Sequence, residues 1–172
     1  MAFTEGTVQE IRELTPKQRL EEVLKRAQDS DDFFMLKWLR SGITIKNAEA
    51  LSPTHCKATF VFKVDNFYGN RSGNLHGGAA SAMYDILTTM VLAAMTENGD
   101  IWINGGVSRS LDVTYIRPAP EGEVLECSCE IVSAAKRLAL MKAEMRRQSD
   151  GAVVSTCKHD KASVQIKRSI KL

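Results

Sequence analysis

The sequence predicts an α+β domain in which one long helix packs against a curved antiparallel sheet. A long apolar run follows the polar, glycine-containing residues 70–78, and Asp85 is the only charged side chain between His76 and Glu97. Such a run is typical of a helix that is buried on most sides. Several other stretches alternate apolar and polar residues, which is the period of half-buried strands. One buried helix with several closely linked strands favours a helix on a sheet.

Residues 1–42 are predicted to form a helical extension that packs on the main domain. Thr15-Pro16 is a helix-start pattern, because proline suits the first turn of a helix. A second, short helix is predicted over residues 33–39, with Asp31 and Asp32 as its capping residues. A DNA-reading helical module is the alternative, but acidic residues balance the cations here, and this favours an amphipathic collar.

Alternation predicts the strands on both sides of the long helix. The expected apolar faces are Cys56, Ala58, Phe60, Phe62 and Val64; then Val107, Leu111, Val113 and Tyr115; then Leu125, Cys127, Cys129 and Ile131; and finally Ala139, Met141, Ala143 and Met145. A partner strand precedes Pro53, over residues 43–50, and the last strand follows the turn Ser149-Asp150-Gly151 over residues 152–158. The main domain is therefore expected at residues 43–161, followed by a basic tail at residues 162–172.

Asp85 is the one carboxylate inside the apolar helix. It lies nine residues after His76, so the two side chains point to opposite faces and lie about 13 Å apart along the axis. They would serve one site only if two chains supply it, each helix lending His76 to one site and Asp85 to the other. The alternative is a buried aspartate bonded to nearby backbone amides. Helix geometry leaves both open, because buried carboxylates are rare unless paired or functional.

His76-Gly77-Gly78 opens the predicted helix. The first amides of a helix lack an internal acceptor and attract negative charge, and glycine lets a ligand carbonyl approach the backbone closely. An acyl oxygen at the Gly77 amide would therefore be stabilised as it becomes an oxyanion. His76 or Asn70 would add polar contacts or hold a water molecule, and Asp85 would act as a base or orient that water. The alternative is that the glycines only form a tight turn from strand to helix.

Composition and charge exclude several classes of function. The chain has 172 residues, which suits one domain with a substantial core. Its net charge of +2 gives no reason to expect a nucleic-acid partner. Four cysteines and three scattered histidines lack the spacing of a disulfide framework or a metal site. A charged Asp85 within the apolar run argues against a membrane span.

The cysteine content favours reduced thiols and a cytoplasmic protein, and no secretory signal is recognisable. Mitochondrial and peroxisomal locations stay open. Glu5 and Glu10 argue against a mitochondrial presequence, and the ending Ile170-Lys171-Leu172 matches the peroxisomal Ser-Lys-Leu address only in its last two residues.

Two stretches carry a resemblance to a known family. N-R-S-G-N-L-H-G-G-x(6)-D at residues 70–85, followed by V-S-R-S-L-D-V-T-Y-I-R-P-A at residues 107–119, resembles the hotdog-fold acyl-CoA thioesterases. The similar branch is the small PaaI-like one that includes the acyl-coenzyme A thioesterase 13 type. The resemblance covers about residues 50–160. It implies the hotdog fold, in which a curved antiparallel sheet wraps a central helix.

The resemblance also implies a reaction, the hydrolysis of fatty acyl-CoA to a free fatty acid and coenzyme A. By analogy, the Gly77 amide polarises the thioester carbonyl, and Asn70 and His76 position the thioester and the water. Asp85 comes from the neighbouring subunit as base or water-orienting group, and Ser108 assists it. The family assembles as dimers of dimers, so a homotetramer is implied. No metal or other cofactor is implied, because coenzyme A is part of the substrate.

The same resemblance places contacts to coenzyme A on a further set of residues. These are Asn66, Ser110, Tyr115, Ser133, Ala134, Ala135, Lys136, Arg137 and Leu138. Lys136 and Arg137 would meet phosphates, and the alternative is an ordinary solvated basic hairpin. His159 and Lys161 match a basic strand end in the family, but Ala162 replaces an expected polar residue there.

Two other functions compete with the thioesterase. Hotdog hydratases typically carry a catalytic aspartate upstream of the histidine that precedes the helix, whereas the prominent acid of this chain lies downstream, at Asp85. A non-catalytic acyl-CoA or lipid sensor would be marked by loss of that acid, but Asn70, Asp85 and Ser108 are all present. A sensor would bind acyl-CoA without Asp85-dependent release of thiol.

Overall fold

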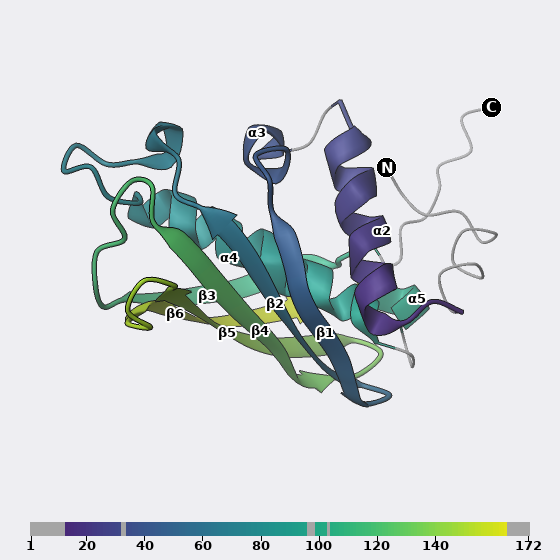
Figure 1. Cartoon of the computed structure of the whole chain (residues 1–172). Coiled ribbons are helices and arrows are strands. Elements are labelled where there is room, and N and C mark those ends of the chain that lie inside the picture. The colour runs from purple at the N-terminus through teal and green to yellow at the C-terminus, as the bar shows by residue number, and fades with distance from the viewer. Residues whose placement is uncertain (1–12, 32–33, 96–98, 103, 165–172) are drawn as a thin grey trace, which may run out of the picture.

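The structure of the protein is a computed structural model that describes residues 13–31, 34–95, 99–102 and 104–164. Figure 1 shows a curved sheet with the long helix α4 (Gly77–Val91) running across one of its faces. The shorter helix α2 (Pro16–Asp29) lies near strand β1 and the far end of α4. The α+β hotdog architecture that the sequence predicts is thereby confirmed.

Six strands form one antiparallel sheet. Their spatial order is β1 (Thr44–Ser52), β2 (His55–Lys63), β4 (Val124–Ala134), β5 (Leu138–Arg147), β6 (Val153–Ala162) and β3 (Val107–Tyr115). The short link between β3 and β4 does not make them neighbours, because β3 pairs with β6 at the edge of the sheet. The chain crosses from that edge to the middle of the sheet before β4 begins.

The core lies between the sheet and α4. The apolar faces predicted for β2, β4 and β5 are buried, as are Met83, Tyr84 and Leu87 of the helix. The predicted helix is present from Gly77 to Val91. A 3-10 turn follows at Leu92–Ala94, and Met95 leaves the helical conformation. Gly99 begins the short helix α5 (Gly99–Trp102), and residues 96–98 lie outside the described ranges.

Helix α2 begins where the sequence predicts. The Thr15 hydroxyl accepts from the Gln18 amide at 3.3 Å, and the Gln18 side chain accepts from the Thr15 amide at 2.9 Å, which is a capping box. Arg19 is buried, and its guanidinium donates to the carbonyls of Leu14 and Met95. This arginine therefore ties the extension to the end of the central helix.

The second N-terminal helix is shorter than predicted. Helix α3 covers Leu36–Leu39 instead of residues 33–39, and no side chain caps it. Met35 precedes it in the left-handed conformation with φ 64°, which breaks the helical path because that region disfavours side chains with a Cβ. Asp31 does not cap it, and Asp32 lies outside the described residues.

Strand β3 departs from simple alternation. Its pairing with β6 shifts between Ser108 and Ser110, so Arg109 forms a β-bulge. A bulge inserts one extra residue into a strand, so the alternation of side chains between the two faces of the sheet shifts by one residue beyond it. Ser108 and Tyr115 therefore both reach α4, although an odd spacing would place them on opposite faces. The predicted apolar face is only partly buried, since Val107 and Tyr115 are each 54% exposed.

Candidate functional site

Tyr84 fixes the rotation of α4 against the sheet. Its buried hydroxyl donates to the Ser155 carbonyl on β6 at 2.7 Å and accepts from the Met145 amide on β5 at 2.9 Å. Burial raises the pKa of Tyr84 far above its ordinary value, so the phenol stays a neutral donor. Because Tyr84 is anchored in this way, the next residue, Asp85, points toward the ends of β3 and β6.

The Asp85 carboxylate is held by side chains. The Ser108 hydroxyl donates to Asp85 Oδ1 at 2.7 Å, and His159 Nε2 lies 3.2 Å from the same oxygen. Within the described ranges no backbone amide donates to this carboxylate, so the alternative of an aspartate bonded to amides does not describe it. The side chain is 44% exposed in the single chain, which leaves room for a substrate or water molecule at the carboxylate.

His159 and Lys161 complete this cluster, and the sequence had assigned neither of them to the site. Strand β6 continues to Ala162, beyond the predicted end at Lys158, and this brings both side chains beneath α4. Their inward position on the strand was a usable signal, because basic side chains are seldom buried without a function. We call the cluster the Asp85 network; it consists of Asp85, Thr88, Thr89, Ser108, His159 and Lys161.

The contacts within the Asp85 network are short. His159 is fully buried, with Nε2 2.9 Å from Ser108 Oγ and Nδ1 2.6 Å from Thr88 Oγ1. Lys161 is 3% exposed, and its Nζ donates to Thr89 Oγ1 at 2.9 Å and to Ser108 Oγ at 3.2 Å. Ser108 is thus the point where the carboxylate, the imidazole and the ammonium meet.

Burial decides the protonation of the two basic groups. It lowers the pKa of His159 from its ordinary 6.5 to about 4, helped by the charge of Lys161 and opposed by Asp85 and Asp160. Burial also lowers the pKa of Lys161, against the attraction of Asp85. The imidazole is therefore neutral at neutral pH, and it offers one donor and one acceptor.

The buried neutral histidine predicts a pH dependence of stability. Below about pH 6.5 His159 becomes protonated in the unfolded chain, whereas in the folded chain it stays neutral down to about pH 4. The free energy of unfolding therefore decreases as the pH falls from about 6.5 to about 4. Between pH 7 and pH 4.5 wild type should lose about 2 kcal/mol more than His159→Gln, which cannot titrate there. Urea unfolding at both pH values measures this, and equal losses in the two proteins would refute a buried neutral His159.

A second set of predicted residues gathers at the start of α4. His76 is the N-cap, and its Nδ1 accepts from the Gly78 amide at 3.0 Å. Within the described part of the chain, no acceptor is bonded to the Gly77 amide. The His76 side chain therefore satisfies one of the orphan amides of the helix, and the Gly77 N–H stays available to a ligand oxygen.

Tyr115 supports this helix end from β3. Its hydroxyl donates to the Gly77 carbonyl at 2.7 Å and lies 2.7 Å from the Ser81 hydroxyl. A Cβ on Gly77 would lie 3.2 Å from the ring carbon Cζ of Tyr115, so the ring packs closely against the glycine. A residue that the sequence assigned to coenzyme A thus also positions the first turn of α4.

The two predicted asparagines bond within or near the loop before α4. The Asn70 side chain accepts from the amides of Ser72 and Asn74, at 2.9 and 3.2 Å, so its oxygen shapes the loop. Its amide nitrogen has no partner among the described residues. The Asn66 side chain donates to Glu121 at 3.0 Å.

The turn between β4 and β5 contains the remaining predicted residues, from Ser133 to Leu138. Trp102 donates to the Ala135 carbonyl at 2.9 Å, and Ser163 bonds to the Lys136 carbonyl at 2.7 Å and to the Arg137 carbonyl at 2.9 Å. These bonds fix the backbone of the turn while both basic side chains remain exposed. Ser110 is also exposed, on β3, which β6 separates from β5 and its turn.

The structure divides the predicted site residues into two groups. Leu138 and Val107 both pair with Ala162, so the β4–β5 turn lies at the same end of the sheet as Ser108 and Asp85. The residues around Gly77 lie at the other end of α4. Asp85 lies eight positions after Gly77 in the helix, which is about 12 Å along the axis. Within one chain, the two groups do not form a single site.

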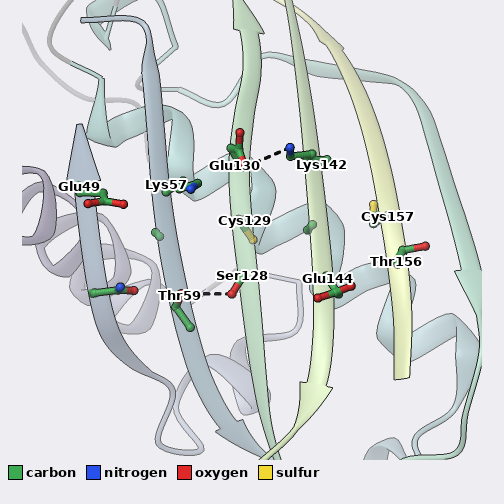
Figure 2. A pocket seen from close by; sticks show the side chains of 13 residues that line it. Glu49, Lys57, Thr59, Ser128, Cys129, Glu130, Lys142, Glu144, Thr156 and Cys157 are labelled. Carbon is green, nitrogen blue, oxygen red and sulfur yellow. Dashed lines mark hydrogen bonds and ion pairs between the residues drawn. The ribbon is translucent and has the colours of Figure 1, made fainter. Parts of the chain in front are cut away.

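A hollow on the opposite face of the sheet contains none of these residues. Figure 2 shows its polar lining across β1, β2, β4, β5 and β6, with the helices behind the sheet. Lys142 pairs with Glu130 at 3.2 Å, and Thr59 bonds to Ser128 at 3.2 Å. These side chains satisfy one another, so we place the candidate chemistry on the α4 side of the sheet.

The described residues carry neither a metal cluster nor a membrane-spanning helix. Across residues 13–31, 34–95, 99–102 and 104–164, no group of three histidine, cysteine or acidic side chains is placed to hold a metal ion. In those same ranges, no helix is both long enough and apolar enough to cross a membrane. All four cysteines are buried and free.

Comparisons with known proteins agree with this geometry. The family model described as "Thioesterase superfamily" matches residues 72–154. Mouse acyl-coenzyme A thioesterase 13 is 31% identical over 99 residues, which are 58% of this chain and 67% of the mouse protein. Zebrafish thioesterase superfamily member 2 has a similar structure, with a TM-score of 0.72 and 23% identity over 88% of this chain and 99% of that one. The PaaI protein of E. coli has a TM-score of 0.66 and 14% identity, over 88% of this chain and 97% of PaaI.

Proposed function

Because this chain belongs to the thioesterase superfamily and is therefore a thioester hydrolase, we propose that it hydrolyses fatty acyl-CoA to a free fatty acid and coenzyme A. The Asp85 network carries the proposal, because it holds a half-exposed carboxylate beside a serine and a buried neutral histidine. The name of the mouse relative supports acyl-CoA as the substrate class.

The hydrogen bonds of the Asp85 network support Asp85 as a general base. Thr88 donates its one proton to the Tyr84 carbonyl at 2.6 Å, so His159 Nδ1 must donate to Thr88, and Nε2 of the neutral ring is an acceptor. Ser108 then has one proton for two acceptors, Nε2 and Asp85 Oδ1. A proton added to Asp85 lets Asp85 donate to Ser108 and Ser108 donate to His159. When Asp85 takes a proton from water, both acceptors of the network therefore obtain a hydrogen bond, which favours Asp85 as the base.

The proposed reaction uses this base and the free amide of the helix. Asp85 removes a proton from a water molecule as its oxygen bonds to the thioester carbon. The carbonyl oxygen gains negative charge and is stabilised by the Gly77 N–H and the helix dipole. Collapse of this intermediate breaks the carbon–sulfur bond, and the leaving thiolate takes up the proton. Asn70 and His76 line the approach to Gly77 and help to orient the thioester.

The proposed site is shared between two copies of the chain. Reacting atoms need to approach to about 3–3.5 Å, whereas about 12 Å of helix separates Gly77 from Asp85 in one chain. A two-fold arrangement that sets the Gly77 end of one α4 beside the Asp85 network of its partner brings both groups to one thioester. We therefore propose a homo-oligomer, with a dimer of dimers as the complete assembly.

The coenzyme A part of the substrate is assigned to the turn beside the Asp85 network. Lys136 and Arg137 are exposed there on a backbone that Trp102 and Ser163 hold in place. Such cations suit phosphate groups. Ser110 of β3, on the other side of β6, adds a polar side chain, and Tyr115 and Asn66 belong to the Gly77 end.

Thiol release from a panel of acyl-CoA esters tests the proposed function. The panel covers short to long chains and one aromatic acyl group, so the same data identify the preferred acyl class. Wild type should release thiol from at least one member. Binding of acyl-CoA with no thiol release from any member would contradict hydrolysis and establish the sensor instead.

Mixed oligomers test the shared site. Asp85→Asn and Gly77→Pro each inactivate both sites of their own dimer, but a mixed dimer contains one site with an intact Gly77 and an intact Asp85. Equal, randomised mixing gives half mixed dimers with one site of two, so about a quarter of wild-type turnover should return. Mass spectrometry of the intact oligomers verifies the exchange, and verified mixed dimers without recovered turnover would rule out the shared site.

A further inference from the structure

Lys161 is a buried cation with an unusual set of partners. Its ammonium is 3% exposed and donates to two hydroxyls, those of Thr89 and Ser108. In the described ranges no carboxylate oxygen lies within ion-pair distance of it. Removing an ammonium from water is costly unless a charge or several acceptors compensate. Fold stability alone would therefore favour an apolar side chain at this position.

The contact to Ser108 gives this cation a chemical effect. An ammonium can only donate, so Lys161 occupies one lone pair of the Ser108 oxygen. Of the two acceptors that remain, Asp85 Oδ1 at 2.7 Å is charged and His159 Nε2 at 2.9 Å is neutral, so the Ser108 proton turns toward Asp85. The charge also opposes any further proton on the network, and it is one of the causes that lower the pKa of His159. The titratable groups that face Lys161 are the Asp85 carboxylate on α4 and the neutral His159 imidazole on its own strand, while the neighbouring Asp160 pairs with Arg109.

We propose that Lys161 is a positioning residue of the thioesterase reaction, which aims the Ser108 hydroxyl at Asp85 and keeps the Asp85 network free of extra protons until the water reacts. This inference rests on the proposed function. Lys161 touches neither the thioester nor the water, and it acts through Ser108.

The test compares Lys161→Met with Lys158→Met, which removes an exposed lysine from the same strand. Lys161→Met should lower kcat about tenfold, the effect of one charge-assisted hydrogen bond. KM for acyl-CoA should stay within about twofold. Without the cation the network binds protons more readily, so the acidic limb of the kcat/KM profile should move to higher pH. Lys158→Met should match wild type throughout.

Thermal unfolding separates this role from a structural one. Replacing a buried ammonium by methionine removes a desolvation cost, so the Tm of Lys161→Met should equal or exceed that of wild type. A lower Tm with an unmoved pH profile would make Lys161 a structural residue and overturn the proposal. If Lys161→Met does not fold, Thr89→Val can be used instead, because it removes one of the two hydroxyls that hold the Lys161 ammonium. It should move the acidic limb of the kcat/KM profile in the same direction.

A double-mutant cycle tests the route through Ser108. If Lys161 acts through that hydroxyl, Lys161→Met should change kcat less than about twofold in a Ser108→Ala background. The same tenfold loss in both backgrounds would reject this route. If wild type turns over acyl-CoA and Lys161→Met has the same kcat, the role of Lys161 is rejected but the proposed function stands. If wild type shows no turnover, the proposed function itself is rejected.

Discussion

Replacing Gly77 by proline will lower kcat for acyl-CoA hydrolysis about a hundredfold to a thousandfold, the loss expected when one oxyanion donor is removed. Proline has no N–H, and the Gly77 amide is the proposed donor. The helix should tolerate the change, because proline is favoured at the first helical position. His76 before it is extended, with φ −69° and ψ 135°, which suits a residue that precedes proline.

Gly77→Ala is the matched control for this experiment. Both variants place a Cβ 3.2 Å from the Tyr115 ring, but only alanine keeps the N–H. The difference in kcat between them therefore measures the amide, while the loss they share measures the displacement of Tyr115. Circular dichroism and size-exclusion chromatography check that both fold and assemble. Equal kcat values for the two variants would remove the Gly77 amide from the mechanism.

Replacing Asp85 by asparagine will lower kcat about a hundredfold to ten-thousandfold, which is the contribution of a positioned general base. Asparagine has the same shape and still accepts a hydrogen bond from Ser108, but it cannot take a proton from water. The half-exposed position of the side chain predicts an unchanged Tm and oligomer. Turnover at saturating acyl-CoA measures the effect.

Asp112→Asn serves as the control for the lost charge, because it removes an exposed carboxylate from the same strand as Ser108. It should retain wild-type turnover. If Asp85→Asn retains it as well, Asp85 is not the base, and the hydrogen-bond argument for the Asp85 network fails with it.

Local patterns account for what the sequence could predict. The buried helix from Gly77 follows from its uninterrupted apolar composition, and the faces of β2, β4 and β5 follow from strict alternation. The start of α2 follows from Thr15-Pro16. Each of these features depends on residues that are close together in the chain. The periodicity of apolar residues and the capping residues can be recognised from such short segments.

The parts that escaped prediction depend on contacts between distant segments. No local pattern places β3 beside β6, and the bulge at Arg109 that turns both Ser108 and Tyr115 toward α4 arises from that pairing. The sequence at the end of β6 is polar, so no apolar alternation marks His159 and Lys161 as buried. Both are buried in the structure, where each contacts the hydroxyl of Ser108. Asp85 and Ser108 were therefore predicted as site residues, whereas the histidine and the lysine behind them were matched only to a basic strand end and were not assigned to the site.

The source of the oxygen added to the fatty acid tests the central claim, that Asp85 activates water to attack the thioester. Enzyme in excess over acyl-CoA is reacted in ¹⁸O-labelled water for a single turnover, and the acid and the peptide containing Asp85 are analysed by mass spectrometry. Asp85 acting as a base predicts one ¹⁸O atom in the acid and none in Asp85. Label in the Asp85 carboxylate would mean that Asp85 itself attacks the thioester, and acyl-CoA recovered bound and unhydrolysed would mean that the protein is not a thioesterase.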